Sequence, residues 1–402
     1  METWSDVESL INQREFKRAE VAIAKKLRND LSSGEKATGL LYRAKLRLLT
    51  GRANDSVVDL DEIKRLSSPI QSSDSPEFLE VLADAHFQRY EQATVGFADK
   101  NDLEVAITTY RILITQHEHY INLGWIYYQF GRLELVRGNA SQAEQCYKAA
   151  LFQPSYVTAL TAYCYERLAY VALYEQRDYR QALVLIDKAL ATYPANDSVI
   201  WLFQSYLLKS KIYQYIDLNK ALESAKKALS LASTGNLSKI VLAEALFAVA
   251  DLSSKSRGLE RDVIEYAQQF LHISKTPVGI DVTWSRSHEL LGNAFFAMGR
   301  YEQAVNAYLN MLQFNPYHPW DNAIKLRIAQ CHHRMGHYQK VIDLLVKVAN
   351  GNDVSGDYQT FEMLGHAYFA LERHSDAKDA YEKAHKLAPQ GTNILTANTT
   401  RS

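Results

Sequence analysis

Histidines between positions 332 and 337 come closest to the spacing of a metal site. His333 and His337 are four residues apart, which can place two imidazoles on one face of a helix. Gly336 lies between them, however, where a helix is expected to end, and no third ligand type follows nearby. We therefore predict that these histidines are ordinary helix and turn residues and that the chain binds no metal.

Residues that could perform catalysis show no organised pattern. The chain has no glycine-rich phosphate loop and no Gly-x-Ser-x-Gly turn, and its carboxylates are spread over the whole length. The three cysteines Cys146, Cys164 and Cys331 are scattered and fit small packing positions. We predict that the protein is not an enzyme and needs no cofactor. An active site that assembles only in the folded chain is the remaining alternative.

Tyrosine and arginine offer a different chemistry, that of partner recognition. The chain contains 25 tyrosines. Tyrosine and arginine anchor protein interfaces because they combine a large contact area with directional hydrogen bonds. Which of them face a partner depends on the helices that carry them.

The segment from 288 to 316 has the sequence pattern of two antiparallel helices. The small residues Gly292 and Ala304 allow two backbones to approach, and Tyr308 fills the space between them. Gly299 can adopt the left-handed conformation that ends a helix. We expect helix pairs to break near Gly51, Gly138, Gly299 and Gly336. Pro316 cannot continue the second helix.

This pattern recurs along the chain. Every offset seen between Leu291 and Pro316 is repeated between Leu364 and Pro389. A small residue that opens each second helix recurs at steps of 36 to 42 residues. We place this marker at Ala106, Ala143, Ala182, Ala221, Val263, Ala304, Val341 and Ala377. The pattern resembles the tetratricopeptide repeat (TPR), a helix pair of roughly 34 residues.

The resemblance implies an all-α fold, a right-handed α-solenoid of about ten antiparallel helix pairs that form a TPR-like superhelix. We expect N-terminal helix pairs at 1–66, divergent repeats at 77–274, typical repeats at 284–389 and a flexible tail at 390–402. The Ser- and Pro-rich stretch 67–76 is the best candidate for a boundary.

In the tetratricopeptide superhelix the first helix of each pair lines the concave surface. Placing this register on the sequence gives candidate partner-binding residues on that face. They are Tyr128, Arg132, Arg167, Tyr174, Tyr206, Tyr213, Asn293, Phe296, His333, Arg334 and His366.

Two functions follow from the resemblance. The first is a scaffold or adaptor that binds a peptide segment or a partner's helix in the concave groove, as a subunit of a multi-protein complex. The chaperone-binding subtype does not fit, because Leu326, Gln330 and His366 do not complete its basic residues. The alternative is a ligand-gated regulator whose superhelix closes around a short peptide. Residues 1–66 show no basic recognition helix for DNA.

Composition narrows the partners and the compartment. The 402-residue chain has 45 basic and 46 acidic residues and a formal charge of −1, which does not favour direct nucleic-acid binding. An odd number of scattered cysteines fits a reducing compartment. The N-terminus lacks the pattern of a signal peptide, and no apolar run is long enough to cross a membrane. We predict a cytoplasmic protein with protein or peptide partners.

Overall fold

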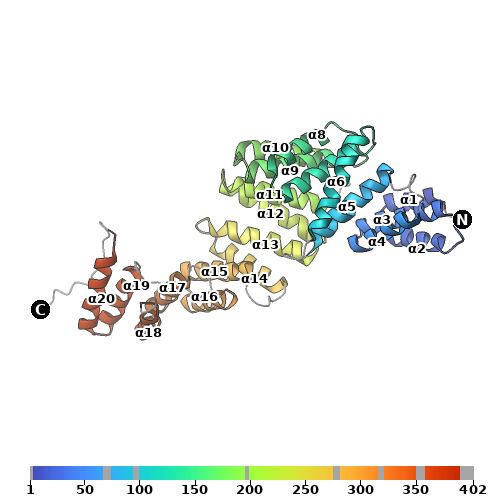
Figure 1. Cartoon of the computed structure of the whole chain (residues 1–402). Coiled ribbons are helices and arrows are strands. Elements are labelled where there is room, and N and C mark those ends of the chain that lie inside the picture. Colours follow the sequence, from blue (N-terminus) through green and yellow to red (C-terminus); the bar gives the residue numbers. More distant parts are fainter. Residues whose placement is uncertain are drawn as a thin grey trace. The chain divides into compact units, whose positions relative to one another are not determined.

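The computed structural model describes residues 3–66, 74–93, 99–194, 199–274, 281–315, 321–349 and 358–389. Within these ranges all regular structure is helical, in twenty α-helices, with no strand (Figure 1). Pro316, the larger part of the predicted 67–76 linker and the predicted tail lie outside the described residues. The first ten helices are α1 Trp4–Asn12, α2 Phe16–Leu27, α3 Ser33–Leu49, α4 Ala53–Leu66, α5 Pro76–Gln92, α6 Lys100–Gln116, α7 Leu123–Val136, α8 Ala140–Ala150, α9 Leu160–Tyr174 and α10 Tyr179–Thr192. The second ten are α11 Val199–Tyr213, α12 Leu218–Thr234, α13 Lys239–Ser254, α14 Glu260–Ile273, α15 Val282–Ala297, α16 Tyr301–Phe314, α17 Asp321–Arg334, α18 Tyr338–Ala349, α19 Tyr358–Ala370 and α20 His374–Leu387.

The helices form ten consecutive pairs among the described residues. Each odd-numbered helix packs against the even-numbered helix that follows it. From α2 to α9, and again from α12 to α19, the second helix of a pair also packs against the first helix of the next pair. A core built only from such neighbour contacts is that of a repeat protein. The prediction of an all-α solenoid of about ten helix pairs is confirmed.

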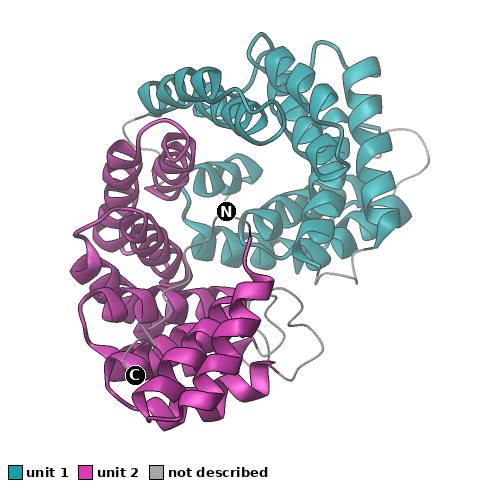
Figure 2. Ribbon diagram, turned by 90° about the vertical axis from the view of Figure 1, so that its left-hand side faces the viewer, with its two compact units in different colours: residues 1–197 teal, residues 198–402 magenta. Residues whose placement is uncertain are grey.

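The chain divides into two compact units, residues 1–197 and residues 198–402 (Figure 2). Unit 1 contains α1–α10, and its largest apolar cluster spans α3 to α8. Unit 2 contains α11–α20 and has several smaller clusters along its length. The division by repeat type that the sequence suggested is a different one, and it stays a prediction.

Glycines with positive φ angles mark five of the turns between paired helices in the described ranges: four at the predicted positions, and a fifth at Gly258, with a φ angle of 85°. Gly51, Gly138, Gly299 and Gly336 have φ angles of 77°, 80°, 73° and 74°. A residue without a Cβ atom adopts this left-handed conformation with little strain. The chain can therefore reverse direction after the first helix at a low cost in conformational energy.

Three of the helix pairs share a contact between a glycine and a tyrosine ring. A Cβ atom built on Gly292 would lie 2.6 Å from Cδ1 of Tyr308. The equivalent atom on Gly365 would lie 2.6 Å from the Tyr381 ring, and that on Gly131 2.7 Å from the Tyr147 ring. Real Cβ atoms do not come this close to another atom, so any larger residue would push the paired helices apart.

In unit 1 the first helices also contact one another. Contacts join α1 to α3, α3 to α5, α5 to α7 and α7 to α9. We call the surface that these five helices share the first-helix face of unit 1. It is the part of the fold that places the candidate residues of α7 and α9 side by side.

Candidate partner-binding face

Local sequence fixes where the central helices of this face begin and what they bury. Pro76 occupies the first turn of α5, and Ser75 caps the helix by accepting a hydrogen bond of 3.2 Å from the backbone N–H of Phe78. Helices α5, α7 and α9 bury residues on most of their circumference because a helix packs on either side of each.

Arg132 connects α7 to α5. Its Nη1 atom donates to Oε1 of Gln129 over 2.9 Å, and its Nη2 atom donates to Oε1 of Glu91 over 2.6 Å. The guanidinium also lies 5.3 Å from the centre of the Phe87 ring. The side chain keeps 30% exposure. Arg132 is therefore held in place by α5 while part of it remains open to solvent.

Arg167 lies on the neighbouring first helix, α9, and has fewer partners. Its Nη2 atom is 3.4 Å from Oε1 of Glu166, and its buried Nε atom has no acceptor among the described residues. Burial lowers the pKa of Arg167, but the combined effect of Tyr128, Glu166 and Tyr147 is larger and raises it. The net pKa is above the ordinary value, so the guanidinium stays charged. The side chain is 25% exposed.

Tyr128 belongs to the core beneath these arginines. It is only 2% exposed, and its ring lies 5.2 Å from Trp125, 5.9 Å from Tyr147 and 6.0 Å from Tyr163, measured between ring centres. The expectation that Tyr128 offers a surface for a partner is wrong, because α8 and α9 close over its ring. Burial raises the pKa of its hydroxyl.

Glu80 on α5 is buried and connects α5 to the segments that precede α7 and α9. Its carboxylate accepts hydrogen bonds from the Tyr120 hydroxyl (2.5 Å), the Asn122 amide (2.8 Å) and the Tyr156 hydroxyl (3.1 Å). The donors come from the segments that precede α7 and α9. Burial, followed by the nearby charge of Asp84, raises the pKa of Glu80 to about 7.

Asp84, one turn further along α5, is a second carboxylate of this kind. It accepts from the Tyr110 hydroxyl over 2.6 Å and from Nε1 of Trp125 over 3.2 Å. Burial raises its pKa as well. Sequence reasoning missed both acids. The available signal was a pair of carboxylates one helical turn apart within the mainly apolar segment 78–85.

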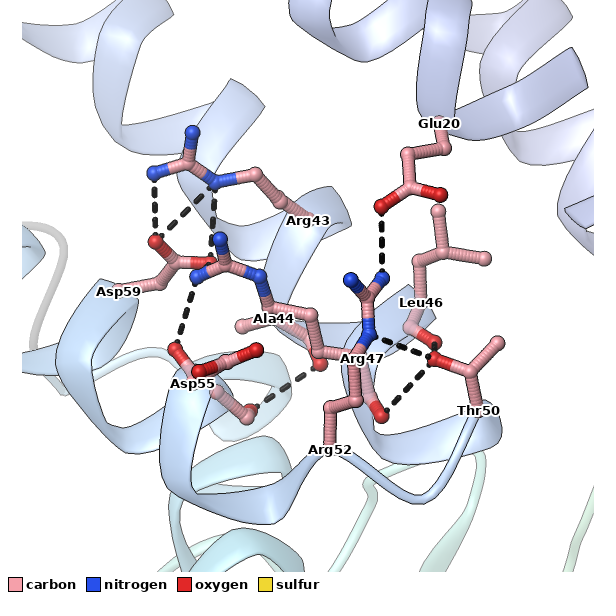
Figure 3. Close-up of polar contacts among 10 residues, drawn as sticks. Glu20, Arg43, Ala44, Leu46, Arg47, Thr50, Arg52, Asp55 and Asp59 are labelled. Carbon is pink, nitrogen blue, oxygen red and sulfur yellow. Dashed lines mark hydrogen bonds and ion pairs between the residues drawn. The ribbon is translucent and has the colours of Figure 1, made fainter. Parts of the chain in front are cut away.

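A separate polar cluster joins α3 to α4 (Figure 3). The Asp59 carboxylate is 1% exposed and lies 2.6 Å from both Arg43 Nη2 and Arg47 Nη1. Arg47 also donates to the backbone carbonyl of Asp55 over 2.9 Å. Asp102 repeats the arrangement between α6 and α5, where it accepts from Nε of Arg89 over 2.7 Å. These ion pairs hold each helix pair together, and we assign them a structural role.

Tyr174, the last candidate in unit 1, is 44% exposed at the end of α9. Its ring centre lies 4.6 Å from that of Tyr170, which is also exposed. The two rings form a small aromatic surface patch. Among the unit 1 candidates, Arg132, Arg167 and Tyr174 are therefore at least partly exposed.

The candidates of unit 2 lie on four different helices, all of them first helices. Tyr206 and Tyr213 on α11 are half-buried. On α15, Asn293 accepts a hydrogen bond of 2.7 Å from Tyr308, and Phe296 lies against Tyr301.

The remaining candidates are in the C-terminal repeats. His333 on α17 and His366 on α19 come together, with ring centres 6.2 Å apart. Nδ1 of His366 is also 2.9 Å from the Tyr381 hydroxyl. Arg334 is exposed. The structure thus brings these two histidines of unit 2 together.

Among the described residues, no group of three or more His, Cys, Asp or Glu side chains is placed to hold a metal ion. No helix in the described part of the chain combines the length and the apolar character that a membrane crossing requires.

Comparison with known proteins supports the repeat assignment. The family model for the tetratricopeptide repeat matches residues 285–318 and 358–390. The apo form of RapI has a similar structure, with a TM-score of 0.57 and 12% identity over 87% of this chain and 97% of that chain. A STAND protein with a tetratricopeptide repeat sensor, PH0952 from Pyrococcus horikoshii, has a TM-score of 0.50 and 15% identity over 89% of this chain and 63% of that chain. No curated protein matches the sequence. Identities this low concern the fold alone, and together these matches identify the chain as a helical-repeat protein that carries tetratricopeptide repeats at residues 285–318 and 358–390.

Proposed function

We propose that this protein is a non-enzymatic interaction scaffold that binds a peptide segment or a partner's helix on the first-helix face of unit 1. One observation carries the proposal. Arg132 and Arg167 come from consecutive first helices, and both are partly exposed above a layer of buried tyrosines. Partly exposed arginines on a rigid aromatic base are the residue types that anchor protein interfaces.

The chemistry of the other groups supports binding rather than catalysis. The carboxylates of Glu80 and Asp84 are occupied by hydroxyl, amide and indole donors. The three thiols are buried, and burial raises the pKa of Cys164 to about 12 and that of Cys146 to about 11. A thiol in such a state is a poor nucleophile at neutral pH.

The wider setting follows from the same proposal. A scaffold of this kind acts as one subunit of a multi-protein complex, and we place it in the cytoplasm with protein or peptide partners. The near balance of 45 basic and 46 acidic residues gives no support to direct binding of nucleic acid.

Peptide selection with the full chain tests the proposal. Random peptides displayed on phage are selected on the wild-type protein, and affinities of the selected peptides are measured by fluorescence anisotropy. Arg132→Ala combined with Arg167→Ala should weaken binding about thirtyfold, because truncation of interface hot spots costs about 2 kcal/mol or more. Circular dichroism should show that the variant remains folded.

The matched control replaces two exposed arginines on second helices of unit 1, Arg111→Ala with Arg180→Ala. This pair should change affinity little. Loss of binding in the control pair, with normal binding in the Arg132 and Arg167 pair, would place the partner on the opposite surface and contradict the proposal.

The same peptides separate the scaffold from the peptide-gated regulator. Small-angle X-ray scattering of the free and bound protein gives the radius of gyration in each state. An unchanged radius supports a scaffold. A clear decrease on peptide binding would support a regulator that closes around its signal instead.

A further inference from the structure

The outer side of α2, the second helix of the first pair, carries a row of basic side chains. Lys17, Val21, Lys25 and Arg28 follow one another at steps of four, four and three residues, and all four are exposed. This spacing places them on one side of the helix, since Arg28 at its C-terminal end keeps a helical backbone conformation. Arg14, in the turn before α2, is a further exposed cation. We call these five residues the α2 stripe.

The positive charge of the α2 stripe is not compensated within the protein. Its four cations have no ion-pair partner among the described residues. The two carboxylates of this segment are used by other groups. Glu15 pairs with Arg18, and Glu20 lies 2.8 Å from Arg52, the residue before α4 (Figure 3). The stripe therefore attracts negatively charged partners from solution.

Two other second helices show how an exposed helix face is usually neutralised. On α8, Nζ of Lys148 lies 2.6 Å from Oε1 of Glu144, and on α20 the Lys378 and Glu382 side chains are 3.9 Å apart. Pairs of opposite charge four residues apart stabilise a helix. On α2, the residue four positions from both lysines of the stripe is Val21 instead of an acid.

Val21 contributes an apolar side chain to the middle of this charged row. It is 69% exposed, and the neighbouring Ala24 is exposed as well. The core of the first pair is formed by the opposite side of α2, where Ala19, Ala22 and Ile23 are buried. Cations around an exposed apolar side chain are typical of a helix that lies on a membrane. The cations attract anionic headgroups, and the apolar side chain enters the boundary between headgroups and acyl chains.

A nucleic acid fits the α2 stripe less well than a membrane. Its phosphate backbone offers negative charge but no apolar layer for Val21. Single-stranded bases are held by stacking on aromatic side chains, and the stripe has none. The row from Lys17 to Lys25 is straight and about 12 Å long, which suits contact with an extended surface.

We propose that the α2 stripe binds the surface of a membrane that is rich in anionic lipids. The contact is peripheral, with α2 lying on the bilayer. It goes beyond the proposed scaffold function and is independent of it, because α2 is a second helix and does not belong to the first-helix face. Each cation near such a surface raises the affinity about fivefold.

Vesicle sedimentation with the full-length protein tests the proposal. Vesicles of pure phosphatidylcholine are compared with vesicles that also contain about 30% phosphatidylserine. At about 0.1 M salt, the wild-type protein should sediment with the phosphatidylserine vesicles and remain in solution with the neutral ones. Salt at about 1 M should release it, because the Debye length falls to about 3 Å. Absence of binding to the phosphatidylserine vesicles at low salt would overturn the proposal.

Variants connect the binding to the α2 stripe. Lys17→Gln with Lys25→Gln should weaken vesicle binding about 25-fold, because two cations are lost. Replacement of both lysines by arginine should preserve it. Val21→Ser should weaken binding severalfold, because a polar side chain gains nothing from the apolar boundary. The matched control is Arg111→Gln with Arg180→Gln, which removes the same charge from exposed positions of α6 and α10 and should change binding little. All replaced residues are exposed, and circular dichroism checks that each variant is folded.

The other outcomes have distinct meanings. If the control pair weakens vesicle binding as much as the lysine pair, net charge is responsible and the α2 stripe is not the contact. If Val21→Ser binds like the wild type, the apolar side chain does not enter the bilayer and that part of the proposal is wrong. If double-stranded DNA or poly-glutamate binds through the lysine pair and vesicles do not, the partner is another polyanion and the lipid assignment fails. Peptide binding to the first-helix face is measured separately, so none of these results decides the scaffold proposal.

Discussion

Single hydroxyl groups in this protein differ in their environment although their positions in the repeat are the same. Tyr147, Tyr308 and Tyr381 each pack on a glycine of the paired helix. Only the last two have a partner on that helix for their hydroxyl. A buried donor without an acceptor gives up its hydrogen bonds to water and gains nothing in return.

Removal of these hydroxyls should therefore have unequal effects on stability. Tyr308→Phe should lower the free energy of unfolding by about 0.5–1.5 kcal/mol, because it deletes a hydrogen bond. Tyr147→Phe should cost nothing or stabilise the protein, because the hydroxyl it removes has no acceptor. Chemical denaturation followed by circular dichroism measures both. An equal loss in the two variants would show that the Tyr147 hydroxyl is satisfied in the free protein.

Glu80 gives the protein a predictable pH dependence. Its folded-state pKa of about 7 is higher than the ordinary value of 4.5, so the folded chain binds this proton more tightly than the unfolded chain. The resulting stabilisation is fully present below about pH 4.5 and is lost as the pH rises through 7.

The measurement compares wild type with Glu80→Gln, which cannot titrate. Free energies of unfolding from urea titrations between pH 5 and about 8 should fall with rising pH more steeply in wild type than in the variant. Because the charges of Glu80 and Asp84 affect each other, the difference between the two curves reports the titration of Glu80 together with its effect on Asp84. Parallel curves would contradict the raised pKa of this carboxyl group.

Helix pairs depend on turns that force the backbone into a left-handed conformation. Glycine supplies this conformation after α3, α7, α13, α15 and α17. Arg177 and Glu372 take it after α9 and α19, with φ angles of 55° and 59°. A side chain in this region costs roughly 1–2 kcal/mol. The turns at Arg177 and Glu372 are therefore strained, and packing of the helices on either side must offset that strain.

Substitutions at Gly34 and Gly299 distinguish the effect of backbone conformation on stability from the effect of steric clashes. A Cβ atom at either position would meet nothing within 4 Å, but only Gly299 has a positive φ angle, of 73°. Gly299→Ala should therefore destabilise the protein by about 1 kcal/mol. Gly34→Ala, in the first turn of α3, should stabilise it by roughly 0.4–1 kcal/mol. Thermal melts of both variants test this. A loss of stability at Gly34 equal to that at Gly299 would contradict the role given to the turn.

At the scale of the whole molecule, the core is built from contacts between helices that are neighbours in the sequence. Within each unit, a helix packs against the helices that precede and follow it, so each pair completes the core of the next. In unit 1 this stacking brings alternate helices into contact and creates a shared face from α1, α3, α5, α7 and α9. Such a surface binds partners through many side chains drawn from several repeats, which is why we look for function in a face rather than in an enclosed pocket.

The sequence alone determined the fold and the positions of the turns. Small and large residues at fixed steps predicted the helix pairs, and Gly51, Gly138, Gly299 and Gly336 predicted where four of them reverse. These features are local, because a turn depends on one residue's backbone freedom and a pair depends on two adjacent helices. The repeat period of the sequence therefore predicts both the turns and the helix pairs directly.

Only the tertiary structure decided which candidate residues face solvent. Tyr128 and Arg132 are one helical turn apart, yet neighbouring helices bury the first and leave part of the second exposed. The Glu80 cluster joins residues as distant in sequence as Tyr156, 76 positions away. Hydrogen bonds over such separations depend on how successive pairs stack, and a repeat period does not record that arrangement. The physical reason is that burial and pairing are properties of the packed helices, whereas the period is a property of each helix pair by itself.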